Sequence, residues 1–212
     1  EVYSLWTMTA EYQKFDSLIE ICIDGQWVPA ASAQALGMDR CRIDYLASYS
    51  FSKNPPPISL TMPLQWDPDP VLAGFGLVDQ LDRRPPSFLY DLVPQGQGRR
   101  LLVRLLGLVD EDRMVMPLLS AGAFNPIGAL RLSKAVDFYK DQVRLNPVNV
   151  EFDGVTLDEI EKKSDSFLSH ISLHAMLASG TTGVQGVAPK YLLTQDDGGK
   201  WHADLSLSDA LA

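Results

Sequence analysis

The residues best suited to chemistry gather in one glycine-rich segment, 179–190, in the C-terminal part of the sequence. Its glycines recur at every third position over 180–186, and Lys190 follows them. Glycines let a backbone approach a ligand closely and aim successive N–H groups at an anion, and a lysine adds a full positive charge for phosphate oxygens. The segment is not a Walker A loop, because Tyr191 stands where that motif has serine or threonine. On spacing alone, a phosphate-binding loop and a plain connecting loop are both open.

The three histidines do not predict a metal site. His170 and His174 are four residues apart, so a helix would place them on one face. The sequence HISLH lacks the glutamate of the HExxH zinc motif, and the remaining histidine is His202. We therefore expect packing or surface histidines and no metal ligands. Because the sequence also has no G-x-S-x-G nucleophile elbow, we assign no catalytic residue to it.

The cysteine content favours a cytoplasmic protein. Cys22 and Cys41 are the only cysteines, which is too few for a disulfide framework or a zinc site. We expect both to be free, buried thiols in a reducing compartment. No secretory signal is visible, and no uninterrupted apolar run of about 18 residues predicts a membrane span.

The charge of the chain argues against direct contact with nucleic acid. Its 18 basic and 27 acidic side chains give a net charge of −9, whereas nucleic-acid-binding domains carry basic surfaces. Of the stretches 1–80, 81–144 and 145–212, only the middle one has more basic than acidic residues. A solvated helix face and a docking surface for an acidic partner both explain this excess. The arginines concerned are Arg83, Arg84, Arg99, Arg100 and Arg104.

The elements that position these residues predict an α+β fold, beginning with a β-hairpin over 18–28. Apolar and polar residues alternate over 19–23, and Asp24-Gly25 follows. Glycine supplies the positive φ that a tight two-residue turn requires, so this pattern predicts two antiparallel strands.

Two further strand-like segments are expected next. The stretch 42–51 is rich in isoleucine and tyrosine and predicts a strand, which the prolines at 55–57 would end because they cannot donate ladder hydrogen bonds. A short edge segment is expected over 58–64, closed by Pro63.

Helical signals follow. The stretch 99–108 has the period of an amphipathic helix, with Gly107 as its cap. A second short helix is expected over 115–119 and a strand over 128–132. The leucines expected on the apolar face of the first helix are Leu101, Leu102, Leu105 and Leu106.

A boundary between two units, 1–147 and 148–212, is expected at Asn146-Pro147, where the composition turns acidic. After it, Thr156 and Glu159 fit a capping box, in which each side chain satisfies the other residue's backbone N–H. The further expected elements are a helical pattern over 167–175, a strand over 187–194, a turn over 196–199 and a strand over 201–207.

Taken together, five segments resemble the N-terminal half of a HipA-type toxin kinase, the kinase component of a toxin–antitoxin pair. The hairpin ICIDGQWV resembles the family's opening strand–turn–strand, and ISLTMPL at 58–64 its serine- and leucine-rich segment ending in Pro-Leu. FLYDLVPQGQGRRLL at 88–102 resembles the family's run from an aromatic residue to arginine. PIGALRL at 126–132 resembles its glycine-alanine strand, and GVQGVAPKYLL at 183–193 its nucleotide loop. Order and rough spacing agree over almost the entire chain.

The resemblance implies an ATP-dependent serine/threonine protein kinase. Residues 1–147 would be its N-terminal β-rich subdomain with short helices, and 148–212 the start of a kinase-like nucleotide-binding lobe. ATP would be the cofactor with Mg²⁺, whose ligands, like the catalytic aspartate, are expected outside this chain, so the chain alone should transfer no phosphate. The residues expected at the phosphates are Thr182, Gly183, Val184, Gln185, Gly186 and Lys190. Members of the family autophosphorylate a serine beside this loop, and the candidates here are Ser179, Thr181 and Thr182.

The implied partners are an antitoxin of helix-turn-helix type, which would make any contact with nucleic acid, and a protein substrate. No membrane partner is implied. The loop departs from the family's plainer form because 186–189 separate Gln185 from Lys190, which indicates a divergent branch. An alternative function is a non-catalytic binding module that docks an antitoxin or protein substrate, with the basic face of 99–104 as the expected contact. A structural domain without a ligand is disfavoured by the composition of the loop.

Overall fold

The computed structural model of the 212-residue chain describes residues 11–64, 71–74, 87–111, 113–124, 128–145, 154–162 and 193–203. The strands are β1 (Ser17–Ile23), β2 (Gln26–Ala35), β3 (Arg40–Tyr45), β4 (Val71–Gly74), β5 (Leu130–Leu132), β6 (Leu193–Gln195) and β7 (Trp201–Ala203). The helices are η1 (Gln13–Phe15), α2 (Ala47–Ser50), α3 (Ser87–Asp91), α4 (Gly96–Leu105), α5 (Val115–Gly122), α6 (Ser133–Leu145) and α7 (Leu157–Glu161).

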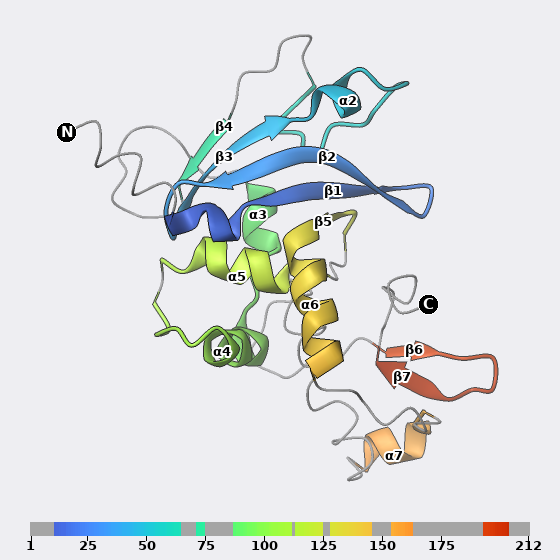
Figure 1. The fold of residues 1–212 in the computed structure, drawn as a ribbon. Coiled ribbons are helices and arrows are strands. Elements are labelled where there is room, and N and C mark those ends of the chain that lie inside the picture. Colours follow the sequence, from blue (N-terminus) through green and yellow to red (C-terminus); the bar gives the residue numbers. More distant parts are fainter. Residues whose placement is uncertain are drawn as a thin grey trace.

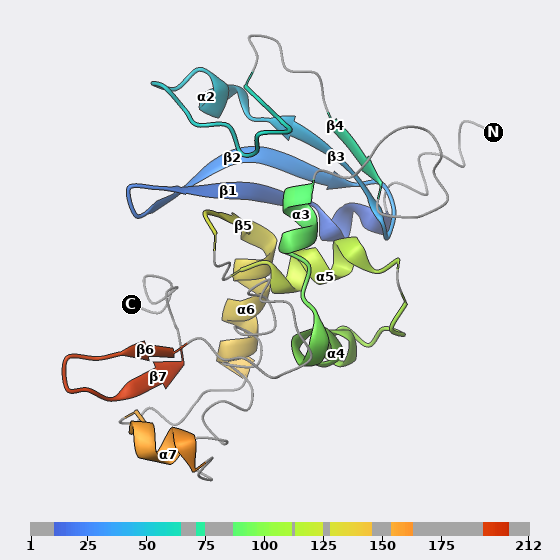
Figure 2. The same ribbon diagram turned by 180° about the vertical axis from the view of Figure 1, so that it is seen from behind.

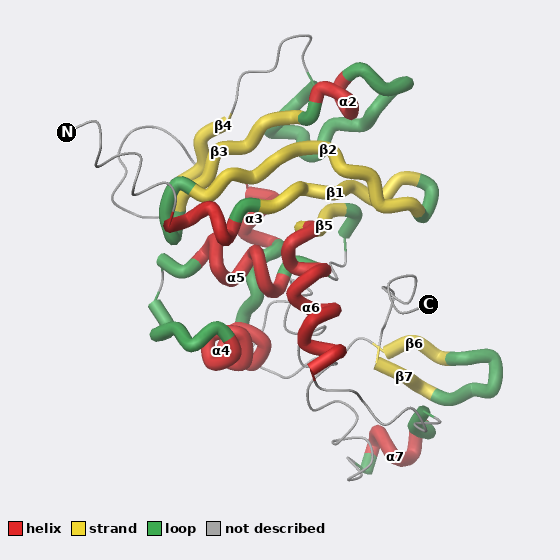
Figure 3. The backbone as a smooth tube through the Cα atoms, viewed as in Figure 1, coloured by secondary structure: helices red, strands yellow, loops and turns green. Residues whose placement is uncertain are grey.

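The architecture is α+β, as the sequence predicts. A five-stranded antiparallel sheet has the order β4-β3-β2-β1-β5, and β6 pairs with β7 in a second, two-stranded sheet. Helices α3 to α6 lie on one side of the larger sheet (Figures 1 and 2). Coloured by secondary structure, the backbone shows the strands of the larger sheet as one layer above these helices (Figure 3). Among the described helices, none is long and apolar enough to cross a membrane.

The predicted β1–β2 hairpin is confirmed. Asp24 and Gly25 form its two-residue turn with φ of 49° and 78°, the left-handed values that a tight hairpin turn needs. Farther along the pair, the register shifts at Ile19 and Glu20, opposite a stretch that contains Pro29. A proline cannot donate to the ladder, so its place at an irregularity is the one that a strand tolerates.

The inner face of the sheet carries the core. Ile19 and Ile43 have no exposed surface, and the alternation of buried and exposed residues along β1 and β3 follows the period of a strand. Helix α5 lies against this face, and all eight of its residues are buried. Phe124 and Tyr139 stack with ring centroids 4.4 Å apart, which joins the end of α5 to α6.

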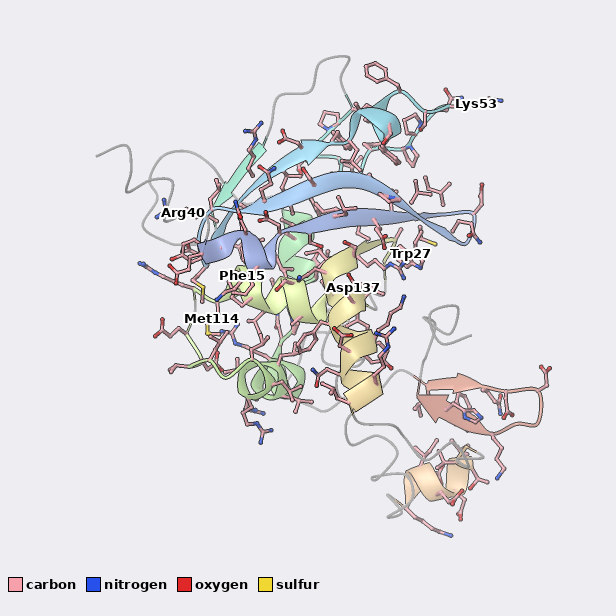
Figure 4. The ribbon with its side chains drawn as sticks, viewed as in Figure 1. Phe15, Trp27, Arg40, Lys53, Met114 and Asp137 are labelled. Atoms are coloured by element: carbon pink, nitrogen blue, oxygen red, sulfur yellow. The ribbon has the colours of Figure 1, made fainter. Side chains whose placement is uncertain are left out.

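The three-residue strand β5 is held to the sheet by a charged cluster as well as by its ladder. Arg131 Nε donates to Glu20 Oε2 at 2.6 Å, and both side chains are largely buried. The same guanidinium lies over the ring of Trp27, 4.2 Å from its centroid, where a cation is attracted by the π face. Trp27 lies close to the β5 end of the sheet in Figure 4. One arginine therefore links β1, β2 and β5.

The predicted helix over 99–108 is confirmed, although α4 begins earlier, at Gly96. Its C-terminal end is a Schellman motif, in which Gly107 N–H donates to Arg104 O at 3.1 Å and Leu108 N–H to Val103 O at 3.0 Å. Gly107 has a φ of +64°, so its capping role is confirmed. Leu102 is fully buried as expected, whereas Leu105 is 39% exposed and lies at the edge of the apolar face.

The predicted strand over 42–51 is wrong beyond Tyr45. β3 ends there, and α2 follows as one helical turn. The hydroxyl groups of two tyrosines explain the change, because each needs a partner once its ring is buried. Tyr45 Oη donates to Met62 O and accepts from Ile58 N–H, and Tyr49 Oη donates to Pro56 O. A helical turn brings the second ring to the same loop as the first.

The predicted edge strand over 58–64 is also wrong. The loop instead makes a tight turn with one isolated bridge between Ser59 and Met62. The edge strand of the sheet beside β3 is β4, which the sequence pattern did not reveal. Hydrogen bonding of this loop to the tyrosine hydroxyls replaces the ladder that an edge strand would need.

The structure also describes the region from α5 to α6 and the two cysteines. The short helix at 115–119 and the strand at 128–132 are confirmed as α5 and β5, whereas α6 was not predicted. Cys41 is buried and Cys22 is half-buried, and both are free thiols. The expected boundary at 146–147 and the helical pattern at 167–175 lie outside the described residues.

The tyrosine tether gives a stability prediction. We expect Tyr45→Phe to lower the free energy of unfolding by about 1–3 kcal/mol, because it leaves a buried N–H and a buried carbonyl without their partner. Tyr49→Phe removes one hydrogen bond at a partly buried site and should cost about 1 kcal/mol. Urea unfolding of the two variants measures the difference. Equal losses would contradict the tether.

Candidate functional site

The predicted phosphate-binding residues lie outside the part of the chain that the structure describes. This holds for Thr182, Gly183, Val184, Gln185, Gly186 and Lys190, for the phosphorylation candidates Ser179 and Thr181, and for His170 and His174. The described residues nearest to them are 154–162 on the N-terminal side and 193–203 on the C-terminal side. The geometry of these two flanks is therefore what the structure adds to the candidate loop.

The C-terminal flank is a β-hairpin, as predicted. Leu193 begins β6 three residues after Lys190, and its strand pairs with β7 through Leu193–Ala203, Thr194–His202 and Gln195–Trp201. The turn at 196–199 is confirmed by the bond from Gly199 N–H to Asp196 O at 3.0 Å. The expected start of the second strand at Trp201 is confirmed, and β6 overlaps the end of the strand expected over 187–194. Residues 187–192 and 204–207 of the two expected strands lie outside the described part of the chain.

The N-terminal flank is hydrogen-bonded to that hairpin. Val155 N–H donates to Trp201 O at 2.9 Å, and Trp201 N–H donates to Val155 O at 2.8 Å. This reciprocal pair is an isolated antiparallel bridge between Val155 and β7. Because Val155 is 1% exposed, its side chain is enclosed as well. The two flanks of the candidate loop thus belong to one small unit, which we call the hairpin unit (154–162 and 193–203).

Helix α7 begins directly after the bridge, with the predicted capping box. Glu159 N–H donates to Thr156 Oγ1 at 3.3 Å, and Thr156 N–H donates to Glu159 Oε2 at 2.8 Å. Both orphan N–H groups at the start of the helix are satisfied, as the sequence pattern predicts. The capping box therefore fixes the direction in which the chain leaves the hairpin unit.

Gly154 makes a close approach that another residue would not allow. Its φ is +75°, and a Cβ at this position would lie 2.7 Å from Nε2 of His202 and 2.8 Å from Cβ of Lys200. The sequence pattern did not predict this contact. The signal was present, since glycine before a strand often marks a place where another chain segment comes near.

The Asp196 carboxylate organises the turn of the hairpin. Its Oδ1 accepts from Lys200 N–H at 2.8 Å, and its Oδ2 lies 2.8 Å from Nε2 of His202. The hydrogen bond from His202, followed by that from Lys200, lowers the pKa of Asp196. A lowered folded-state pKa strengthens the turn above the usual carboxyl pKa, and this contribution is lost as the pH falls. Because the Asp196 carboxylate is exposed, its effect is confined to the hairpin turn.

No described side chains form a catalytic or metal-binding constellation. In the described ranges, no three His, Cys, Asp or Glu residues gather to hold a metal ion. Burial raises the pKa of the Cys41 thiol to about 12, so it stays protonated near neutral pH and is a poor nucleophile.

A shallow, open cavity of about 370 Å³ lies where the start of α6 meets β1 and β2. Two of its hydroxyl groups are used within the fold, because Leu18 N–H donates to Ser133 Oγ at 3.2 Å and Lys134 N–H to Ser17 Oγ at 3.1 Å. Ala35 N–H donates to Asp16 Oδ1 at 2.7 Å. We interpret this place as a structural joint between α6 and the sheet, not as a ligand site.

The hairpin unit gives the second prediction. We expect Gly154→Ala to weaken the bridge between Val155 and Trp201 by about 2 kcal/mol or more, since a left-handed φ costs about 1–2 kcal/mol for alanine and the Cβ also clashes. Gly199→Ala is the matched control, because Gly199 has a φ of +80° but only a 3.7 Å contact. Amide hydrogen exchange at Val155 and Trp201 measures the opening. If both variants raise the exchange rates equally, the close approach has no energetic role.

The comparison with known families gives a match in the N-terminal part of the chain. The family model described as the HipA N-terminal domain matches residues 19–133. That range begins within β1 and ends at the first residue of α6, so it covers nearly the whole five-stranded sheet and the helices between. No curated protein and no solved structure matches the chain. Since the match spans more than half of the 212 residues, the chain belongs to the HipA N-terminal domain family.

Proposed function

We propose that the chain contributes the nucleotide loop of an ATP-dependent serine/threonine protein kinase of toxin–antitoxin type. Family membership supports the toxin-related class. The candidate loop is 179–190, with the backbone of 182–186 and the charge of Lys190 directed at the phosphates of ATP. ATP would supply the phosphoryl group, and this chain's own residues would bind and orient it.

The observation that carries the proposal is the joining of the two flanks of the loop. A phosphate loop works when its N–H groups are held at fixed positions before the ligand arrives, because ordering them on binding would cost entropy. The reciprocal bonds between Val155 and Trp201 hold the chain on either side of the glycine-rich segment in one unit. Short flanking segments whose helix cap and turn are hydrogen-bonded are suited to holding a phosphate loop in place.

The partners that we propose are an antitoxin of helix-turn-helix type and a protein substrate. Contact with nucleic acid would be made by the antitoxin, because a chain with a net charge of −9 repels phosphate backbones. Phosphorylation at Ser179, Thr181 or Thr182 would place negative charge beside the proposed phosphate site and so oppose ATP binding. A purely docking role for the chain is the competing function, and it requires no nucleotide.

Nucleotide binding separates these two functions. We expect the chain to bind a fluorescent ATP analogue in the presence of Mg²⁺, and Lys190→Ala to weaken this binding about tenfold through loss of a charge-assisted contact. Lys53→Ala is the control, because Lys53 is an exposed lysine in the loop after α2, far from the hairpin unit in Figure 4. Absence of binding by the unaltered chain, or equal weakening by both variants, would favour the docking role.

A further inference from the structure

Helix α4 has an unusual charge for this protein. Its sequence, GQGRRLLVRL, contains three arginines and no acidic residue, whereas acidic residues outnumber basic ones by 27 to 18 in the whole chain. The proposed nucleotide loop does not involve this helix, which lies within the family-matched range.

Arg99 is used inside the fold. Its Nε donates to Asp110 Oδ1 at 2.8 Å, and its Nη2 donates to Glu111 O at 2.7 Å. Its side chain is 22% exposed. These bonds hold the segment after α4 back against the helix, and the Schellman motif at Gly107 fixes the intervening turn. Arg99 is thus a structural residue that connects α4 to the segment after it.

The outward side of the helix carries two further arginines. Arg100 and Arg104 are both exposed and, four residues apart, lie on the same side of α4. Leu101 and Leu105 adjoin them at the same spacing, the first half-buried and the second 39% exposed. Within the described ranges, Arg104 forms no ion pair. We call these four residues the α4 face.

The chemistry of the α4 face fits an acidic partner. A guanidinium group binds a carboxylate through two parallel hydrogen bonds and is weakly hydrated, which makes arginine effective at protein interfaces. Leucines beside it offer apolar contact to the same partner. Such a small set can suffice, because a few side chains carry most of the energy of an interface. Duplex DNA fits less well, since leucines gain nothing from phosphates and the net charge of −9 opposes approach.

From this arrangement we propose that the α4 face docks an acidic, amphipathic segment of a partner protein, in which carboxylates meet Arg100 and Arg104 and apolar side chains cover Leu101 and Leu105. The capped C-terminal end of α4 supports the proposal, because a face that is already ordered loses little freedom on binding. It does not depend on nucleotide binding.

Fluorescence anisotropy tests the proposal with a labelled synthetic peptide that has glutamates on one helical face and leucines on the other. We expect the chain to bind this peptide and the affinity to fall as salt screens the charges. The double variant R100E/R104E should bind about tenfold or more weakly, and L105D should also bind more weakly. The double variant R40E/K53E, which reverses two exposed charges on the sheet side, is the matched control and should stay within about twofold.

Several results would overturn the proposal. They are no binding of the acidic peptide, equal binding of a peptide with lysines in place of the glutamates, and equal weakening by the control variant. Tighter binding of a labelled DNA duplex through the same arginines would assign the face to nucleic acid instead. Circular dichroism of each variant shows whether it is folded, so that a loss of peptide binding can be assigned to the altered side chains.

Discussion

Burial of helix α5 is the packing constraint on which the described part of the N-terminal fold depends. Every one of its residues is enclosed, and Pro117 is tolerated because it lies in the first turn, where its missing N–H has no intrahelical partner to lose. Met116 N–H donates to Met38 O at 2.8 Å, and Leu132 N–H donates to Ala123 O at 2.8 Å. These two bonds tie the ends of α5 to the turn before β3 and to β5. Removing this helix from the sheet would expose the inner faces of both layers at once.

Local chemistry explains why some elements could be predicted from the sequence. The Asp24-Gly25 turn, the Gly107 cap and the capping box at Thr156 each depend on a few neighbouring residues, so residue types alone specify them. The family resemblance, which the matching of residues 19–133 confirms, also depends on such short segments. Prediction succeeded for elements that are stabilised by contacts between residues close together in the sequence.

The failures have different causes, and only some of them lie in contacts between residues distant in the sequence. The strand expected to continue past Tyr45 ends there because the hydroxyl groups of Tyr45 and Tyr49 find partners in the loop that follows, which propensity cannot show. Helix α6 was missed although Ser133 is a typical first residue and Ala135, Val136 and Tyr139 recur at helical spacing. Of the candidate site, the hairpin and the capping box were predicted, whereas the close approach of Gly154 to His202 required coordinates.

The chain thus carries two separate regions for which we propose binding. The hairpin unit joins the segments on either side of a glycine-rich stretch, and the proposed phosphate loop needs such a joint to hold its N–H groups. The α4 face belongs to the family-matched region and is separate in sequence from that loop. Binding of nucleotide and docking of a protein are therefore independent properties, and each can fail without the other.

Hydrogen–deuterium exchange of the chain with and without ATP and Mg²⁺ tests the central claim most directly. The proposed phosphate loop predicts slower exchange in peptides that cover 179–195 and unchanged exchange in peptides from β1 to β3, because bound phosphates engage the N–H groups of the loop. Unchanged exchange over 179–195 at saturating nucleotide, or slowing confined to the five-stranded sheet, would contradict it.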